Sequence, residues 1–217
     1  MMELKLKEDL LAENDRIAQQ NKELLAQEGV FAFELVGGPG AGKTALLEQI
    51  LAHLASEYRI AVIEGDLYTS KDAERLARYQ SKVVQINTKG ACHLEALSIQ
   101  KTLAELDLAN LDCLIIENVG NLVCTAAFAV GTTVTITLLS IPEGNDKPFK
   151  YPALFEESTA VVINKIDLLT QTNFSLSRAE DDLRTLNPEL EIFPLSSTKG
   201  EGVKEFCGYL SRLIADE

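Results

Sequence analysis

The chain has 217 residues and a formal net charge of −13. This acidic balance argues against a nucleic acid or an anionic membrane as a partner, because both need a basic protein face. Hydrophobic residues make up 46% of the chain and charged residues 24%, which is ordinary for a soluble protein with one α/β domain. We find no pattern of a signal peptide or a membrane span, so we interpret the four cysteines as reduced thiols of a cytoplasmic protein.

The first 27 residues predict a polar, amphipathic helix that precedes a single domain over residues 28–217. Leu10, Ile17 and Leu24 recur at seven-residue spacing and form one apolar stripe along such a helix. The stripe either docks on the chain's own domain, which we favour, or pairs with a helix of a partner.

A glycine-rich loop carries the strongest motif of the chain. Residues 37–44 read G-G-P-G-A-G-K-T and fit G-x-x-x-x-G-K-[ST], the phosphate-binding P-loop, between an apolar strand pattern and a helical pattern. Backbone N–H groups and a helix N-terminus there attract phosphate, Lys43 is expected to reach the β- and γ-phosphates, and Thr44 to bind Mg²⁺. The expected phosphate-binding residues are Gly38, Gly40, Ala41, Gly42, Lys43, Thr44 and Ala45.

The rest of the chain alternates between strand and helix patterns, which predicts an α/β fold. Such alternation is typical of a P-loop NTPase with a predominantly parallel sheet and helices on both faces. Strands are expected over 30–36, 59–64, 83–87, 111–117, 134–139, 160–163 and 191–195, and helices over 45–54, 71–79, from His93 to about 106, and over 203–214.

A second motif, N-K-x-D at residues 164–167, indicates guanine as the base. An aspartate can accept two hydrogen bonds from guanine that adenine does not offer, and the lysine stem can cover the base plane. Residues 196–200 resemble the S-A-K loop of GTPases, although Ser197 and Thr198 replace its alanine and lysine, so only a backbone contact is expected there. The expected base-binding residues are Asn164, Lys165, Asp167, Ser196, Ser197 and Thr198.

Two carboxylates are candidates for the Mg²⁺ side of the site. Glu117 begins the sequence E-N-V-G where Ras-like GTPases carry the D-x-x-G switch, and no glutamine directly follows Gly120 to orient a water, so hydrolysis should be slow. Asp66 follows an earlier strand and is either a second such carboxylate or a helix cap. With Lys43, these residues form the predicted catalytic set.

Cys92, His93 and Cys124 form a candidate Ni²⁺ or Zn²⁺ site. Each follows a predicted parallel strand, and parallel strands end at the same edge of a sheet, so these residues can converge although they are 32 positions apart. Two thiolates and an imidazole suit either metal and leave one position open. The alternative is that they are buried cysteines and a surface histidine. Cys113 and Cys207 are interpreted as core residues.

Several stretches together resemble the HypB family, the hydrogenase nickel-incorporation GTPases of the SIMIBI class, which are relatives of UreG. The resemblance runs from about residue 8 to the end, and its specific parts are A-C-H-L-E-A at 91–96 and I-E-N-V-G-N-L-V-C at 116–124. The P-loop variant and residues 63–67 and 72–75 also match, whereas N-K-x-D is shared with many GTPases.

The resemblance implies a GTP-hydrolysing metallochaperone that helps to insert nickel into [NiFe]-hydrogenase. It implies binding of GTP or GDP with Mg²⁺, a homodimer formed with GTP, and Ni²⁺ or Zn²⁺ bound at the interface by Cys92, His93 and Cys124. The implied partners are a HypA-type zinc accessory protein and the hydrogenase large subunit. Thr44, Asp66 and Glu117 match the Mg²⁺ side of the family site.

Two departures from the family pattern stand out. Thr125 follows Cys124 where the family usually has proline, so the backbone after this ligand is expected to be looser. The N-terminal cysteine motif or histidine-rich tail of some members is absent, so no separate nickel store is expected.

Three alternative functions stay open at this point. A urease-type accessory GTPase would carry a C-P-H metal motif, which this chain lacks. A P-loop kinase or ATPase with structural cysteines is opposed by N-K-x-D. A non-catalytic protein whose metal staples a dimer would show no turnover. Under the favoured hypothesis Glu117 senses the nucleotide and Cys124 holds the metal on one short segment, so hydrolysis would alter metal binding.

Overall fold

Seven strands form one sheet in the order β3-β2-β4-β1-β5-β6-β7, and every neighbouring pair is parallel. The computed structural model describes residues 2–66, 75, 76, 78, 79, 81–88 and 90–217. The predicted α/β class and parallel sheet are confirmed. The strands are β1 (Phe31–Gly37), β2 (Ile60–Asp66), β3 (Lys82–Asn87), β4 (Cys113–Glu117), β5 (Val134–Ser140), β6 (Ala160–Asn164) and β7 (Glu191–Pro194).

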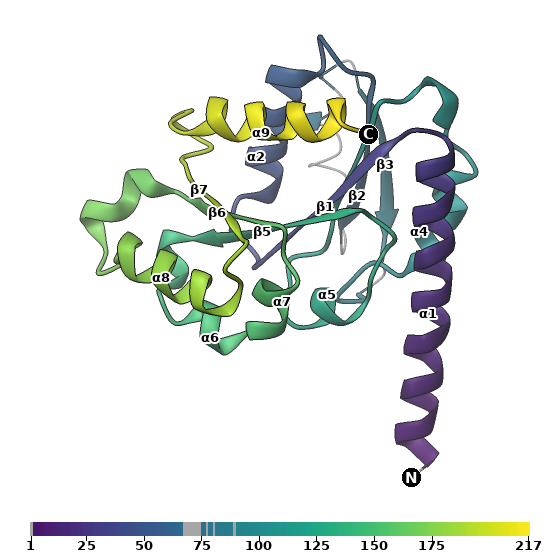
Figure 1. Cartoon of the computed structure of the whole chain (residues 1–217), viewed down its shortest axis with the longest axis horizontal. Coiled ribbons are helices and arrows are strands. Elements are labelled where there is room, and N and C mark those ends of the chain that lie inside the picture. Colours follow the sequence, from purple (N-terminus) through teal and green to yellow (C-terminus); the bar gives the residue numbers. More distant parts are fainter. Residues whose placement is uncertain (1, 67–74, 77, 80, 89) are drawn as a thin grey trace.

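Helices cover both faces of this sheet (Figure 1). One face packs against α2 and α9, and the other against α1 and α4 at one end and α7 and α8 at the other. The helices are α1 (Met2–Gln27), α2 (Lys43–Leu54), α4 (Ala96–Leu103), α5 (Cys124–Ala127), α6 (Lys147–Lys150), α7 (Pro152–Glu156), α8 (Leu176–Leu186) and α9 (Val203–Ala215). Among the described residues, none of the helices has the length and apolar character needed to cross a membrane.

The strands are apolar runs because helices bury them from both sides. All residues of β1, β4 and β6 are buried, as expected for central parallel strands. Glu34 is the ionisable residue of β1. It lies in the middle of the strand, is only 4% exposed, and accepts a hydrogen bond from Asn118. Desolvation by burial raises the pKa of Glu34 to about 7, although the Asn118 hydrogen bond acts in the opposite direction.

Element boundaries differ from the expected ones for local reasons. Helix α4 starts only at Ala96, whose N–H is capped by the Asn14 side chain at 3.0 Å. Strand β4 starts at Cys113 rather than at Leu111, because the Leu111 N–H closes a 3₁₀ turn on the Leu108 carbonyl. The helix expected over 71–79 lies mostly outside the described residues.

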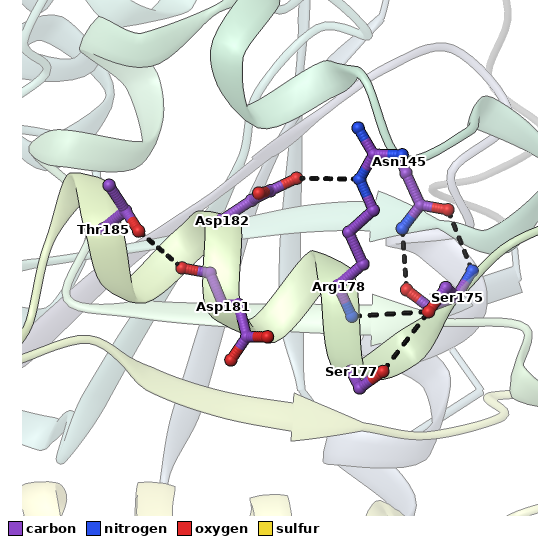
Figure 2. A network of polar contacts seen from close by, with 7 residues as sticks. All are labelled: Asn145, Ser175, Ser177, Arg178, Asp181, Asp182 and Thr185. Carbon is purple, nitrogen blue, oxygen red and sulfur yellow. Dashed lines mark hydrogen bonds and ion pairs between the residues drawn. The ribbon is translucent and has the colours of Figure 1, made fainter.

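The helices α6, α7 and α8 between β5 and β7 were not predicted from the sequence. Ser175 caps α8, the longest of them, by accepting a hydrogen bond from the Arg178 N–H, and Asn145 exchanges two hydrogen bonds with the Ser175 backbone (Figure 2). Arg178 also approaches Asp182 one turn on. A serine before apolar residues at helical spacing was the available signal.

Helix α1 docks on the chain's own domain, which was the favoured alternative, and the docked face includes Ile17 and Leu24 of the predicted stripe. Ile17 is buried, whereas Leu10 is 61% exposed. Between and after these positions the helix buries Asn14 and Asn21, whose side chains bond to backbone groups of Ala96 and of residues 129 and 130. The face is therefore partly polar, and the division of the chain at residue 27 stays a prediction.

We predict that Glu34 makes the stability of the protein fall as pH rises from 5 to 8. The folded state binds the Glu34 proton with a pKa of about 7 and the unfolded chain with its ordinary value of 4.5, so the unfolded chain holds fewer protons in that window. Glu34→Gln removes this term. The difference in unfolding free energy between variant and wild type should therefore grow by about 2.5 kcal/mol from pH 5 to pH 8. Urea unfolding at both pH values measures it, and parallel pH profiles would contradict the assignment.

Candidate functional site

A cavity of about 380 Å³ lies at the carboxyl ends of the central strands, between the P-loop and residues 117–120. The loop leaves β1 at Gly37 and enters α2 at Lys43. Gly42 has a φ of +101°, and a Cβ there would lie 2.4 Å from the Asn164 amide nitrogen, so only glycine suits this position. The loop is thus a backbone cradle at a helix N-terminus, which fits a phosphate chain.

Lys43 and Thr44 begin α2 and line the cavity. The Lys43 ammonium lies back over the loop, 3.2 Å from the Gly37 carbonyl oxygen and 3.4 Å from that of Gly38. The Thr44 hydroxyl donates to Glu117 Oε1 at 2.8 Å. A hydroxyl beside a carboxylate is a hard oxygen donor set, which fits Mg²⁺.

Glu117 lies at the carboxyl end of β4, where it is aligned with Leu35 of β1 and Glu64 of β2. Glu117 is only 5% exposed and Glu64 only 3%. Glu64 and Arg75 also line the cavity, and our sequence reasoning missed both as candidate site residues. The available signal was a carboxylate near the end of a buried strand. Asp66 ends β2 at the same edge, but its side chain lies outside the described part of the structure.

The N-K-x-D segment brings the base-side loop to the P-loop. The Asn164 amide donates to the Ala41 carbonyl at 2.9 Å, and its oxygen accepts from the Ser197 N–H at 3.1 Å and the Ser197 hydroxyl at 3.0 Å. Asn164 is 1% exposed. The Asn164 amide therefore holds the P-loop and the Ser197 loop together. Its contribution to guanine binding is to position these two loops.

Asp167 and Lys165 lie on the turn that Asn164 anchors. Lys165 adopts a left-handed φ of 65° and its ammonium donates to the Gly40 carbonyl. One oxygen of Asp167 accepts from the Ser196 hydroxyl, which also lies 3.2 Å from the Thr198 hydroxyl. The structure thus brings together all the predicted base-side residues, with the Asp167 carboxylate as the side chain suited to a guanine edge.

Cys92, His93 and Cys124 also come together, at the same edge of the sheet. One ligand atom from each can be chosen so that all lie within 4.8 Å of one another, and the two sulfur atoms are 2.7 Å apart. Cys92 and His93 come from the loop before α4, and Cys124 starts α5. Soft sulfur and imidazole donors at this spacing fit Ni²⁺ or Zn²⁺.

The environment of His93 favours the neutral, metal-binding form. Its ring stacks on Phe128 with a centroid distance of 3.8 Å, and its Nε2 is buried with no hydrogen-bond partner among the described residues. Desolvation by burial lowers the pKa of His93, although the nearby Glu95 opposes this. A buried imidazole with an unused nitrogen is consistent with a metal ligand.

The segment 117–124 lies along the P-loop from Glu117 to Asn121. After the Thr44–Glu117 hydrogen bond, Gly120 approaches Pro39 so closely that a Cβ would lie 2.9 Å from the Pro39 Cα. Asn121 then forms an antiparallel bridge with Gly37. The Asn121 side chain accepts from the Cys124 N–H at 2.9 Å. One short segment therefore connects the phosphate cradle to a candidate metal ligand.

Comparisons with known proteins support this geometry. Residues 31–194 match the family model described as "CobW/HypB/UreG, nucleotide-binding domain". The chain is 38% identical over 213 residues to "Probable hydrogenase maturation factor HypB" of Methanocaldococcus jannaschii, which covers 98% of this chain and 96% of the relative. It is 40% identical over 210 residues to "Hydrogenase maturation factor HypB" of Escherichia coli K12, covering 97% of this chain and 72% of the relative.

Solved structures agree with the sequence relatives. HypB from Helicobacter pylori in complex with nickel superposes with a TM-score of 0.88 at 38% identity, covering 94% of this chain and 96% of that one. HypB from Archaeoglobus fulgidus superposes with a TM-score of 0.87 at 32% identity, covering 94% of this chain and 99% of that one. On fold, sequence and family model together, the chain belongs to the HypB group of the CobW/HypB/UreG family of nucleotide-binding proteins.

Proposed function

We propose that this protein is a GTP-hydrolysing metallochaperone that helps to insert nickel into [NiFe]-hydrogenase. The observation that carries the proposal is the segment 117–124. It begins at a carboxylate bonded to the P-loop threonine and ends at Cys124, 2.7 Å from Cys92. Loss of the γ-phosphate would therefore change the position of Cys124 through these eight consecutive residues. The nickel-bound relative and the hydrogenase maturation relatives support nickel as the cargo.

The nucleotide part of the proposal assigns a role to each loop. The P-loop cradles the phosphates, Lys43 balances their charge, and Thr44 and Glu117, with Asp66, would hold Mg²⁺, which would neutralise charge that develops on the transferred phosphoryl group. Asp167 reads guanine, while Asn164 and the 196–198 loop position it. Because no glutamine directly follows Gly120, water is poorly oriented and turnover is slow.

The metal part of the proposal assigns nickel or zinc to Cys92, His93 and Cys124. Three protein ligands leave one position for a further ligand, which suits a cargo that must be passed on. We infer that a second copy of the chain closes the site in a GTP-dependent homodimer. A HypA-type zinc accessory protein and the hydrogenase large subunit are the proposed partners, in the cytoplasm.

Lys43→Ala should lower GTP turnover at least about 100-fold, because it removes the cation that stabilises charge on the transferred phosphate. Steady-state phosphate release at saturating GTP measures this. Lys204→Ala, at an exposed lysine on α9, is the charge-matched control. Equal turnover in wild type and Lys43→Ala would instead favour a non-catalytic protein whose metal staples a dimer.

Asp167→Asn should weaken GTP binding at least about 100-fold and create binding of xanthosine triphosphate, because an amide donates where the carboxylate accepts. Competition between GTP, xanthosine triphosphate and ATP for a fluorescent nucleotide measures the exchange. Asp181→Asn on the exposed side of α8 should leave the order unchanged. ATP competing as well as GTP in the wild type would favour a P-loop kinase or ATPase.

Cys124→Ala should abolish any dependence of metal affinity on the nucleotide. Nickel and zinc affinities are measured with GDP and with a non-hydrolysable GTP analogue, together with mass in solution. The control is Cys207→Ala, because Cys207 lies on the buried face of α9, is 3% exposed and belongs to the core. If the wild type binds metal equally in both nucleotide states, the cysteines are structural and the metallochaperone proposal fails.

A further inference from the structure

Asn118 is a buried amide with no role in the assignments above, although it lies next to Glu117. The residue is 1% exposed, and its side chain makes three hydrogen bonds. The amide oxygen accepts from the Leu94 N–H at 3.0 Å and from its neighbour Val119 at 2.8 Å, and the amide nitrogen donates to Glu34. Both ends of the amide are therefore fixed, one on β1 and the other on the loop before α4.

The contact with Leu94 matters because Leu94 directly follows Cys92 and His93. The Leu94 side chain is also confined: it is 1% exposed and lies so close to Gly65, near the end of β2, that a Cβ on Gly65 would be 2.9 Å from it. We call the loop that carries Cys92 and His93 the Cys92–His93 arm of the metal site, and we call Cys124 the other arm. The Cys92–His93 arm is thus held at Leu94 against the strand ends that surround the nucleotide cavity.

The two arms of the metal site reach the nucleotide side by different routes. Cys124 is connected through the main chain of the segment 117–124. Cys92 and His93 belong to a separate loop, and the Asn118 side chain bonds that loop at Leu94 to the same segment. A movement of the segment would displace only one arm if this bond were missing.

We propose that Asn118 is a positioning residue that transmits the nucleotide state to the Cys92–His93 arm of the metal site. This inference rests on the proposed function and adds a residue to it. Asn118 lines the edge of the nucleotide cavity, but its three side-chain hydrogen bonds go to Glu34, Leu94 and Val119, none of which is a candidate metal ligand. It acts by making the Leu94 backbone follow the segment that starts at Glu117, so that both arms change their relative position when the segment moves.

A purely structural role for Asn118 can be separated from this one, because the chain offers a matched control. Asn14 is also a buried asparagine, 8% exposed, whose oxygen accepts at 3.0 Å from the backbone N–H of Ala96, where the same loop enters α4. It comes from α1, which carries none of the nucleotide-side residues. Asn14→Ala therefore loosens the same loop without touching the segment 117–124.

The experiment uses the full chain with Ni²⁺ as the probe. Nickel dissociation constants are measured for wild type, Asn118→Ala and Asn14→Ala, each with GDP and with a non-hydrolysable GTP analogue. Wild type should show a ratio between the two states of about fivefold or more, as is typical for linked sites. Asn118→Ala should bring the ratio to within about twofold of unity while still binding nickel, whereas Asn14→Ala should keep the wild-type ratio even if both affinities fall.

Each outcome decides between the roles. A wild-type ratio retained in Asn118→Ala, or an equal loss in Asn14→Ala, overturns the positioning role while the proposed function stands. Equal nickel affinity of the wild type in the GDP and GTP-analogue states overturns the proposed function and the inference with it. If Asn118→Ala does not fold, amide hydrogen exchange of the wild type decides: protection of the Leu94 N–H must differ between nucleotide states while that of Ala96 does not. Equal Leu94 protection in both states overturns the inference.

Discussion

The parallel direction of all seven strands is the constraint on which the rest of the structure depends. Parallel strands deliver their carboxyl ends to one edge, so loops far apart in sequence meet there. This is why Asn164 can bond to Ala41, 123 residues away, and why Cys92 and Cys124 lie in contact. The same arrangement buries the strands on both faces, so any ionisable group within them, such as Glu34, carries a large desolvation cost.

Asparagine amides fasten the loops at this edge. Asn14, Asn118 and Asn164 are buried, and each bonds at once to separate parts of the chain that have no regular pairing with one another. An amide suits this use because it carries a donor and an acceptor on one rigid group. The net gain from each such bond is only about 1 kcal/mol, but a buried amide left unpaired costs more, so the bonds fix geometry more than they add stability.

The sequence predicted the parallel sheet, the cradle and the grouping of Cys92, His93 and Cys124, because strand periodicity and glycine spacing are local signals that the parallel order turns into proximity. It did not predict that Asn164 holds loops together, since the motif letter is the same for either role. It placed the docking face of α1 on an apolar stripe, whereas Asn14 and Asn21 take part of that face. Predicting this polar contact requires knowing which carbonyl and N–H groups face the helix, and no pattern in α1 contains that information.

A metal site divided between two loops suits a protein that must release its cargo. Bonds to a metal depend on the relative placement of all ligands, so a shift between Cys124 and the Cys92–His93 loop would weaken the proposed site without breaking either loop. Because linkage is reciprocal, a segment that alters metal affinity with the nucleotide must also alter nucleotide affinity with the metal. A site on one rigid element would bind tightly in both states. The division of the ligands, with Asn118 between the loops, therefore favours transfer over storage.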